Sequence, residues 1–220
     1  MFIKYLGHSC FAINDEKVNL LLDPFISGNA LSLVSPFDLA PDLILVSHDH
    51  GDHLGDTVAI AKKSNCDVLC VADLGNELAM QGLSVIAGNL GGTIDYKHIK
   101  ITYVKAEHTS KFGTPVGFVI KLSNHVIYFA GDTNIFSDMQ LIKELYNPDI
   151  VLLPIDGHYN MGPYEASHAV RLLDPKIVIP MHYGTFPLLG GTPEQFVQEL
   201  KKQNLDTKVI IFKINEEKEF

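Results

Sequence analysis

The stretch Ser47-His48-Asp49-His50-Gly51-Asp52-His53 directly follows the apolar run Leu43–Val46. The apolar run predicts a buried strand, and a helix is expected to begin near Leu54. Four side chains that bind metals well lie within six positions: His48, His50, Asp52 and His53. Imidazole and carboxylate together suit Zn²⁺, Mn²⁺ or Fe²⁺. A polar helix-entry loop would leave three histidines in so short a stretch unexplained.

The spacing of these four side chains favours two metal ions over one. Because neighbouring side chains point in different directions, we expect His48 and His50 to serve one ion, and Asp52 and His53 to serve a second. Two divalent cations about 3.5–4 Å apart are the usual apparatus for hydrolysing esters and phosphodiesters. The stretch therefore predicts a dinuclear hydrolytic centre.

The motif His48-Asp49-His50-Gly51-Asp52-His53 resembles the H-x-H-x-D-H signature of the metallo-β-lactamase superfamily. Further parts of that pattern follow in the expected order: Asp23 at a strand end, His108 in Ala-Glu-His-Thr, Asp132 in Ala-Gly-Asp-Thr, and His182 in Pro-Met-His-Tyr-Gly. The segments Leu6–Phe11 and Met161–Pro163 also resemble the branch of small metal-dependent hydrolases that includes L-ascorbate-6-phosphate lactonase. The resemblance covers nearly the whole chain.

This resemblance implies a full ligand set for two divalent ions. The implied sets are His48, His50 and His108 for one ion, Asp52, His53 and His182 for the other, and Asp132 as the bridge. Zn²⁺ is the expected metal, with Mn²⁺ or Fe²⁺ as alternatives, because all the donors are nitrogen or oxygen. The later ligands follow apolar strands, at the edge where open α/β sheets place their sites.

Several side chains are expected to act around the metals. Asp23 should orient a ligand or the histidine-rich stretch. Asp52 should hold the attacking water through a hydrogen bond while it binds metal. His158, in a loop after another apolar strand, is expected to face the pocket, and we take it as a hypothetical proton donor to the leaving oxygen. His8, in the first hairpin turn, either reaches the pocket or only fixes the turn.

The order of strand and helix patterns predicts a four-layer αββα sandwich. Antiparallel strands over residues 2–23 are followed by strand–helix units as far as Gly82. A second β-rich segment, residues 84–130, is followed by strand–helix units that end in a strand over Lys208–Ile214. No break in composition separates the two halves, so we predict a single domain over residues 1–220.

Composition narrows the class of protein. A hydrophobic content of 46% with 20% charged residues is ordinary for a globular chain, and the net charge of −9 argues against a general nucleic-acid binder. No apolar run reaches membrane-spanning length and the N-terminus enters a strand, so a cytoplasmic location without membrane contact is expected. Cys10, Cys66 and Cys70 are predicted to be buried, reduced thiols.

Three functions remain open at this point. The first is a metal-dependent hydrolase that uses the dinuclear site against a small-molecule ester, lactone or phosphoester, with a homo-oligomer among the states it can adopt. The second is an RNA-processing endonuclease of the same superfamily, although such enzymes usually carry a basic arm and this chain has no Gly- and Lys-rich insertion. The third is a non-hydrolytic metal-binding regulatory or redox module, which a missing ligand would favour. No G-x-S-x-G motif occurs, so a covalent acyl-enzyme is not indicated.

Overall fold

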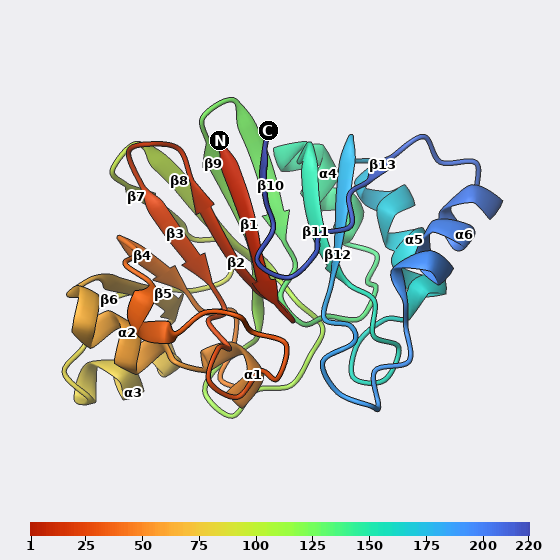
Figure 1. The fold of residues 1–220 in the computed structure, drawn as a ribbon. Coiled ribbons are helices and arrows are strands. Elements are labelled where there is room, and N and C mark those ends of the chain that lie inside the picture. Colours follow the sequence, from red (N-terminus) through yellow and green to blue (C-terminus); the bar gives the residue numbers. More distant parts are fainter.

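Two seven-stranded sheets pack face to face between outer helices in the computed structural model, which describes all 220 residues (Figure 1). Helices α2 (Thr57–Ser64) and α3 (Ala72–Met80) cover the outer face of the first sheet. Helices α4 (Met139–Tyr146), α5 (Pro163–Leu173) and α6 (Pro193–Lys202) cover that of the second. The predicted four-layer αββα sandwich is confirmed.

The first sheet has the strand order β14-β1-β2-β3-β4-β5-β6. Its strands are β1 (Phe2–Gly7), β2 (Cys10–Asn14), β3 (Asn19–Leu22), β4 (Leu43–Leu45), β5 (Asp67–Val71), β6 (Val85–Gly88) and β14 (Glu217–Glu219). Strands β1 to β3 are antiparallel, whereas β3 to β6 are parallel. A 3₁₀ turn, η1 (Pro36–Asp38), and the single-turn helix α1 (Gly51–Leu54) lie in its connections.

The second sheet has the order β13-β12-β11-β10-β9-β8-β7. Its strands are β7 (Thr93–Tyr96), β8 (Ile99–Lys105), β9 (Val116–Leu122), β10 (His125–Phe129), β11 (Ile150–Pro154), β12 (Ile177–Met181) and β13 (Lys208–Val209). Strands β7 to β10 are antiparallel and β10 to β13 are parallel. Strand β11 is buried at every position, as expected for a parallel strand covered on both faces.

The C-terminal segment differs from the prediction. The strand expected over Lys208–Ile214 is only the two-residue β13, and the chain then returns to the first sheet, where β14 pairs with β1 (Figure 1). The last backbone bond to β12 is donated by Ile210 N, and a turn farther on directs the chain toward β14: Glu216 N donates to Lys213 O, and Asn215 has a left-handed backbone with φ of 64°. The apolar pattern hid this turn because Ile211, Phe212 and Ile214 continue the run of strand-forming residues.

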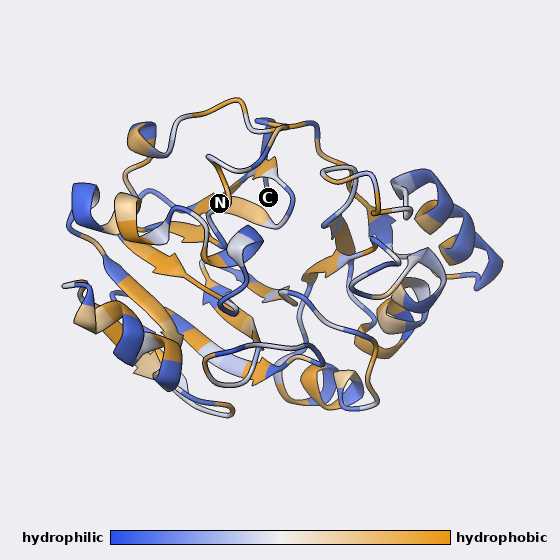
Figure 2. Ribbon diagram, turned by 90° about the horizontal axis from the view of Figure 1, so that it is seen from below, coloured by the Kyte–Doolittle hydropathy of each residue, from blue (hydrophilic) through white to orange (hydrophobic).

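A single cluster of 57 buried hydrophobic residues extends through both sheets and beneath the helices. In Figure 2 the strands are mostly orange, and the helices show blue on the sides turned away from them. Cys10, Cys66 and Cys70 are buried and free, as predicted. None of the helices has the length and apolar character required to cross a bilayer.

Candidate metal centre

The histidines and aspartates singled out in the sequence meet at one end of the sandwich. His48 follows β4, Asp132 follows β10 and His182 follows β12. These strands run parallel within their sheets, so their carboxyl ends share one edge, where open α/β folds place their sites. The fold therefore gathers residues that are more than 100 positions apart in the chain.

The donor atoms form three overlapping groups, each with all its members within 4.8 Å of one another. They are His48, His50 and His108; His8, Asp52, His53 and His182; and His48, His53 and Asp132. We call residues 1–88 the first half and residues 89–213 the second half. Each group takes one member from the second half and the others from the first. The first group has the members of one implied set, the second has those of the other with His8 added, and the third joins Asp132 to one histidine of each set.

The histidine-rich stretch begins its helix earlier than expected. Helix α1 starts at Gly51 instead of near Leu54, and His50 precedes it with an extended backbone (φ −63°, ψ 148°). Two backbone N–H groups, those of His53 and Leu54, donate to the carbonyl of His50. One helical turn then directs Asp52 toward the pocket and buries His53 completely.

Asp23 fixes two neighbouring ligands from a fully buried position. Its Oδ2 accepts a hydrogen bond of 2.7 Å from His53 Nδ1 and one of 2.6 Å from Ser47 Oγ, and its Oδ1 accepts from Ser47 N at 2.8 Å. Because the Ser47 hydroxyl donates to Asp23, it accepts from His48 Nδ1 at 3.0 Å. Asp23 thereby orients both imidazoles so that their Nε2 atoms face the centre, the role that the sequence predicted for it.

Asp156 occupies the corresponding position in the second half, and sequence reasoning missed it. It follows β11, is fully buried, and places Oδ2 3.1 Å from Nδ1 of His182. Its Oδ1 accepts from the backbone N–H groups of His158, Tyr159 and Asn160. The sequence did contain a signal: Asp156 follows the apolar strand β11 in the same way that Asp23 follows β3.

Asp132 lies between the donor groups. Its Oδ1 is 3.1 Å from His53 Nε2, and its Oδ2 is 3.2 Å from His182 Nε2 and 3.5 Å from His108 Nε2. Gly131 brings it there, since φ is 61° and a Cβ would lie 2.8 Å from the Cβ of Ser47. The two halves thus touch directly beneath the site.

His8 reaches the centre and does more than fix its turn. It is fully buried, its Nε2 lies 3.2 Å from Asp52 Oδ2, and its Nδ1 lies 3.0 Å from Thr185 Oγ1. Burial lowers the pKa of His8 to about 4, so the neutral ring donates from Nε2 to Asp52 and accepts at Nδ1 from Thr185. His8, Asp23 and His182 all have left-handed backbones, each at a cost of order 1–3 kcal/mol.

The charges are arranged to keep the carboxylates ionised. Burial alone would raise the pKa of Asp132, but His182 and His53 outweigh it and hold that pKa well below its usual range. Burial would likewise lower the pKa of His182, yet Asp132 and Asp156 raise it to about 9. His48 has the opposite balance: burial, aided by the nearby His53, lowers its pKa to about 2 and keeps it neutral.

The donor set fits divalent cations. Four buried atoms of the donor residues have no hydrogen-bond partner: His53 Nε2, both ring nitrogens of His182, and Asp132 Oδ1. Oxygen atoms lie close to both Nε2 atoms, but outside the directions in which a ring N–H would point. An unsatisfied buried polar atom costs about 1–3 kcal/mol, and shared coordination to a cation removes that cost. Nitrogen and oxygen donors converging in this way suit Zn²⁺, Mn²⁺ or Fe²⁺.

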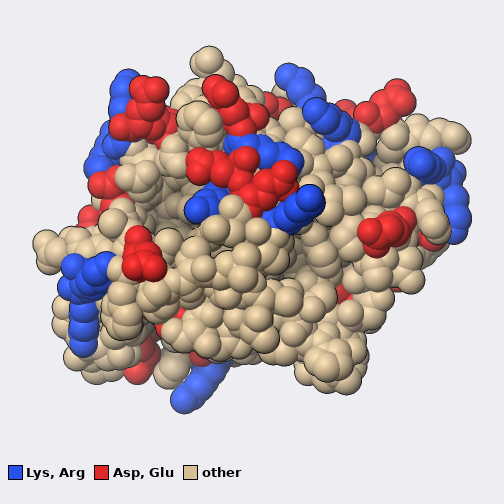
Figure 3. Space-filling model, in the orientation of Figure 1, with Lys and Arg blue, Asp and Glu red and all other residues tan.

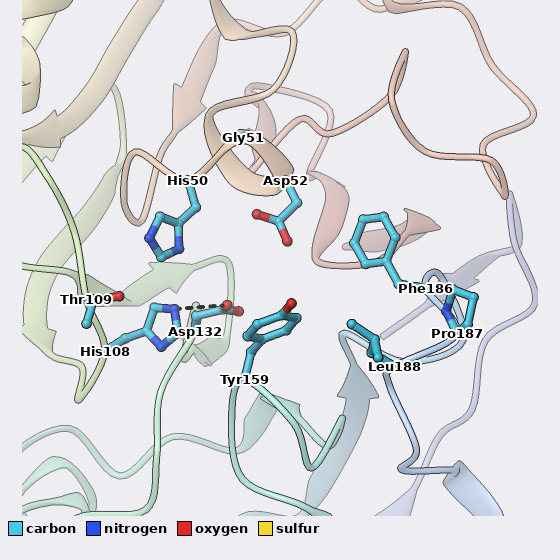
Figure 4. Close-up of a pocket in the computed structure, with 10 residues that line it drawn as sticks. All are labelled: His50, Gly51, Asp52, His108, Thr109, Asp132, Tyr159, Phe186, Pro187 and Leu188. Carbon is cyan, nitrogen blue, oxygen red and sulfur yellow. Dashed lines mark ion pairs between the residues drawn. The ribbon is translucent and has the colours of Figure 1, made fainter.

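A cavity of about 690 Å³ opens over these residues (Figure 4). One side carries His50, Asp52, His108 and Asp132, together with Gly51 and Thr109; the other carries Tyr159, Phe186, Pro187 and Leu188. The first side is the metal-facing wall and the second is the apolar wall, and we keep these names below. In Figure 4 Tyr159 lies between Asp132 and Leu188, with its hydroxyl toward the open centre.

The structure does not place His158 in this cavity. Its side chain is exposed and packs edge-on against the ring of Tyr159, at a centroid distance of 4.6 Å. Gly157, with φ of 72°, turns the chain so that the next residue points outward and Tyr159 faces inward. The prediction that His158 faces the pocket is therefore wrong, and the neighbouring Tyr159 lines the cavity instead. An aromatic residue in a loop already expected at the pocket was the signal available in the sequence.

Comparison with known proteins places these features in a family. A model of the β-lactamase superfamily domain matches residues 2–182. A protein of Methanosarcina barkeri, named a UPF0173 metal-dependent hydrolase, is 45% identical over 97% of this chain and 96% of its own. A protein of the same name from Methanopyrus kandleri is 43% identical over 98% of both chains.

Solved structures share the fold of this chain. Igni18, described as a metallo hydrolase of the archaeon Ignicoccus hospitalis, superposes with a TM-score of 0.92 at 34% identity and covers 100% of both chains. YhfI of Bacillus subtilis, described as a metallo-β-lactamase fold protein, has a TM-score of 0.79 at 16% identity over 99% of both chains, which shows the shared fold.

Proposed function

We propose that this chain, which belongs to the UPF0173 metal-dependent hydrolase family of the metallo-β-lactamase superfamily, uses a dinuclear centre to hydrolyse a small-molecule ester, lactone or phosphoester. It is a metal-dependent hydrolase by family. The observation that carries the finer proposal is the position of Asp132, whose oxygens lie near imidazoles of separate donor groups. An arrangement of this kind suits a pair of ions that share one carboxylate.

Divalent cations in these groups would supply a water of lowered pKa and would stabilise negative charge that develops on the attacked group. His48, His50 and His108 would hold one ion, and Asp52, His53 and His182 the other, with Zn²⁺ as the first choice. Asp23 accepts a hydrogen bond from the outer nitrogen of His53, and Asp156 pairs with the outer nitrogen of His182 at 3.1 Å, which leaves the inner nitrogens for the centre.

Asp52 would accept a hydrogen bond from the attacking water. Its Oδ2 is held by His8, no side chain or backbone group bonds its Oδ1, and the carboxylate lines the cavity (Figure 4). Burial would raise the pKa of Asp52, but the hydrogen bond from His8 and the nearby His53 bring it below its usual range. The carboxylate is therefore an acceptor throughout the working pH range and orients the water.

Two observations support a small substrate over a polynucleotide. The cavity has the volume of an ordinary small-molecule site, about 690 Å³. The net charge is −9, which is unfavourable for long-range attraction of a phosphate backbone. The resemblance of Leu6–Phe11 and Met161–Pro163 to the lactonase branch supports a lactone as one of the substrates to be tested.

The proposal is tested by metal content and turnover measured on the same protein. Elemental analysis after mild purification should find about two divalent ions per chain. A panel of lactones, carboxylic esters and phosphodiesters, assayed with Zn²⁺, Mn²⁺ and Fe²⁺, should show turnover that a chelator removes and added metal restores. His50→Ala should lose both turnover and part of the bound metal, since His50 is a donor in the first group.

His98→Ala is the matched control, because this exposed histidine contacts Asp15 far from the donor groups. It should retain turnover and metal content. Full activity of the metal-free protein, or unchanged turnover and metal content in His50→Ala, would contradict the dinuclear proposal.

A further inference from the structure

We propose that the substrate carries an uncharged, apolar group beside its scissile carbonyl, so that carboxylic esters and lactones of this kind are preferred to phosphorylated or carboxylated compounds. The proposal rests on the proposed function, and it names the substrate class of the same site. Four observations carry it: the apolar wall, the exposure of that wall, the lack of a cation in the cavity, and the free hydroxyl of Tyr159.

The apolar wall faces the donor groups across the cavity. Phe186, Pro187 and Leu188 come from the loop after His182, and Tyr159 comes from the loop after β11 (Figure 4). A substrate whose scissile bond lies at the metal-facing wall must place its remaining part against these side chains. Matching that part to hydrocarbon and aromatic surface favours an apolar group, at about 25 cal/mol for each Å² removed from water.

The wall is exposed to solvent to an unusual degree for such residues. Leu188 is 57% exposed and Tyr159 is 55% exposed. Exposed apolar side chains that border a concave site are typical of ligand-binding surfaces, because the ligand completes their burial. Leu188 keeps more than half of its surface in solvent beside the cavity, so a bound apolar group would bury surface that the fold leaves exposed.

No Lys or Arg side chain lines the cavity. Lys111, two residues beyond the lining residue Thr109, directs its ammonium over the ring of Phe112, 4.8 Å from the centroid. Seen in the orientation of Figure 1, the molecule carries more of its charged side chains in its upper part than in its lower part (Figure 3). A phosphate or carboxylate remote from the scissile bond would therefore lose its hydration without gaining a counter-charge.

Among the four residues of the apolar wall, only Tyr159 has a hydroxyl group. No hydrogen bond within the protein engages it, and it faces the centre of the cavity (Figure 4). A phenolic O–H beside hydrocarbon surface suits the carbonyl or leaving oxygen of a neutral ester. In the reaction the oxygen of water bonds to the acyl carbon and the bond from that carbon to the leaving oxygen breaks. One water proton ends on the leaving oxygen, and the resulting carboxylic acid ionises.

Matched ester pairs test this preference on the metal-loaded protein. The first pair, 4-nitrophenyl hexanoate and mono-4-nitrophenyl adipate, differs by a charge at the end of the acyl chain. The second, phenyl acetate and 4-acetoxybenzoate, differs by a charge on the leaving group. We expect kcat/KM to favour the uncharged member by about tenfold or more in at least one pair, since an unpaired charge in such a site costs more than a methylene.

Leu188→Lys places an ammonium on the apolar wall. The ratio of kcat/KM for the uncharged ester to that for the charged ester should therefore fall at least threefold. Leu145→Lys is the matched control: Leu145 is 69% exposed on α4, outside the cavity, and the ratio should not change. Equal or better turnover of the charged ester in both pairs would overturn this inference, as would an unchanged ratio in Leu188→Lys.

Bis-4-nitrophenyl phosphate separates the two proposals. Metal-dependent turnover of this diester without turnover of any carboxylic ester would overturn the inference and leave the proposed function standing. Metal-loaded protein that hydrolyses neither the diester, the carboxylic esters nor a lactone would overturn both.

Discussion

The two halves of the molecule hold their buried imidazoles by similar means, but they use the holding carboxylate differently. In the first half Asp23 accepts hydrogen bonds only from His53 and Ser47, all within the metal site. In the second half Asp156 lies beside His182 and also accepts the backbone N–H groups that shape the loop of Tyr159. Asp23 supports only the histidine-rich stretch, whereas Asp156 links His182 to the loop that carries Tyr159 of the apolar wall.

This difference teaches how one site separates two tasks. The first half supplies most of the donors from a single loop and helical turn, so its geometry is local and rigid. The second half supplies one donor to each group and also the side chains of the apolar wall. We therefore expect changes in the first half to alter metal binding, and changes in the second half to alter metal and substrate binding together.

Asp132→Asn should have the largest effect, because it breaks the link between the halves. The amide would present an N–H₂ group or a weaker oxygen donor to His53 or His182, which lie 3.1 Å and 3.2 Å away. We expect kcat/KM to fall by more than the 10–100-fold typical of outer-sphere partners, to about 10³-fold or beyond. Steady-state kinetics with elemental analysis checks this, and a loss below tenfold would remove Asp132 from the shared position.

Asp23→Asn and Asp156→Asn sharpen the comparison directly. Each should weaken metal affinity by about 10–100-fold, as removal of a carboxylate behind a metal-binding histidine usually does. At saturating metal, only Asp156→Asn should also raise KM, because an uncharged amide oxygen holds the backbone N–H groups of the Tyr159 loop less strongly than the carboxylate does. Metal titration and KM measurements separate the two effects. Asp149→Asn is the control, because the Asp149 side chain contacts only His125 and Val126. Equal KM values for Asp23→Asn and Asp156→Asn would contradict the division of tasks.

Tyr159→Phe should have a smaller effect, confined to the substrate. Removing one neutral hydrogen bond of about 1 kcal/mol lowers kcat/KM by about tenfold or less. Metal affinity should stay the same, since Tyr159 belongs to none of the donor groups. His158→Ala distinguishes the structure from the sequence-based expectation. A proton donor at residue 158 predicts a large fall in kcat, while the exposed position of that side chain predicts almost none.

Asp15→Asn should have the smallest effect, on stability alone. Asp15, in the first half, accepts from His98 and Ser123 of the second half, away from the site. Despite partial burial, which raises it, the pKa of Asp15 lies below its ordinary value because of these bonds. A lowered carboxyl pKa stabilises the fold above about pH 4 and loses that effect as pH falls through the folded pKa.

We expect a loss of about 1 kcal/mol or less in the free energy of unfolding at pH 7 for Asp15→Asn, the worth of a surface pair. The difference between variant and parent should shrink as the pH is lowered below 4, with turnover at pH 7 unchanged. Denaturant titration at several pH values measures it. A destabilisation that grows toward acid would give the opposite sign and contradict the assignment.

The sequence predicted the layers of the fold and the grouping of donors well, for different reasons. Period-two strands and apolar runs report the sheets because burial acts on each element separately. The His48–His53 stretch is visible because its donors are neighbours in the chain. His108, Asp132 and His182 are isolated residues after strands, and only the resemblance to a known pattern distinguished them from ordinary loop residues.

The remaining errors arise where backbone turns decide side-chain direction. Whether residue 158 or 159 faces the cavity depends on the left-handed Gly157, which no periodicity reveals. Asp156 was missed because its partners are backbone N–H groups of the same loop and an imidazole from another strand. The apolar wall was missed because Phe186 and Leu188 lie in a loop, where exposed apolar residues have no local explanation.

The distribution of donors between the halves bears on how the polypeptide is made. Every group of donor atoms contains one residue of the second half, and His182 is the last of these along the chain. A nascent chain emerging from the ribosome therefore has no complete reactive centre until synthesis has passed β12.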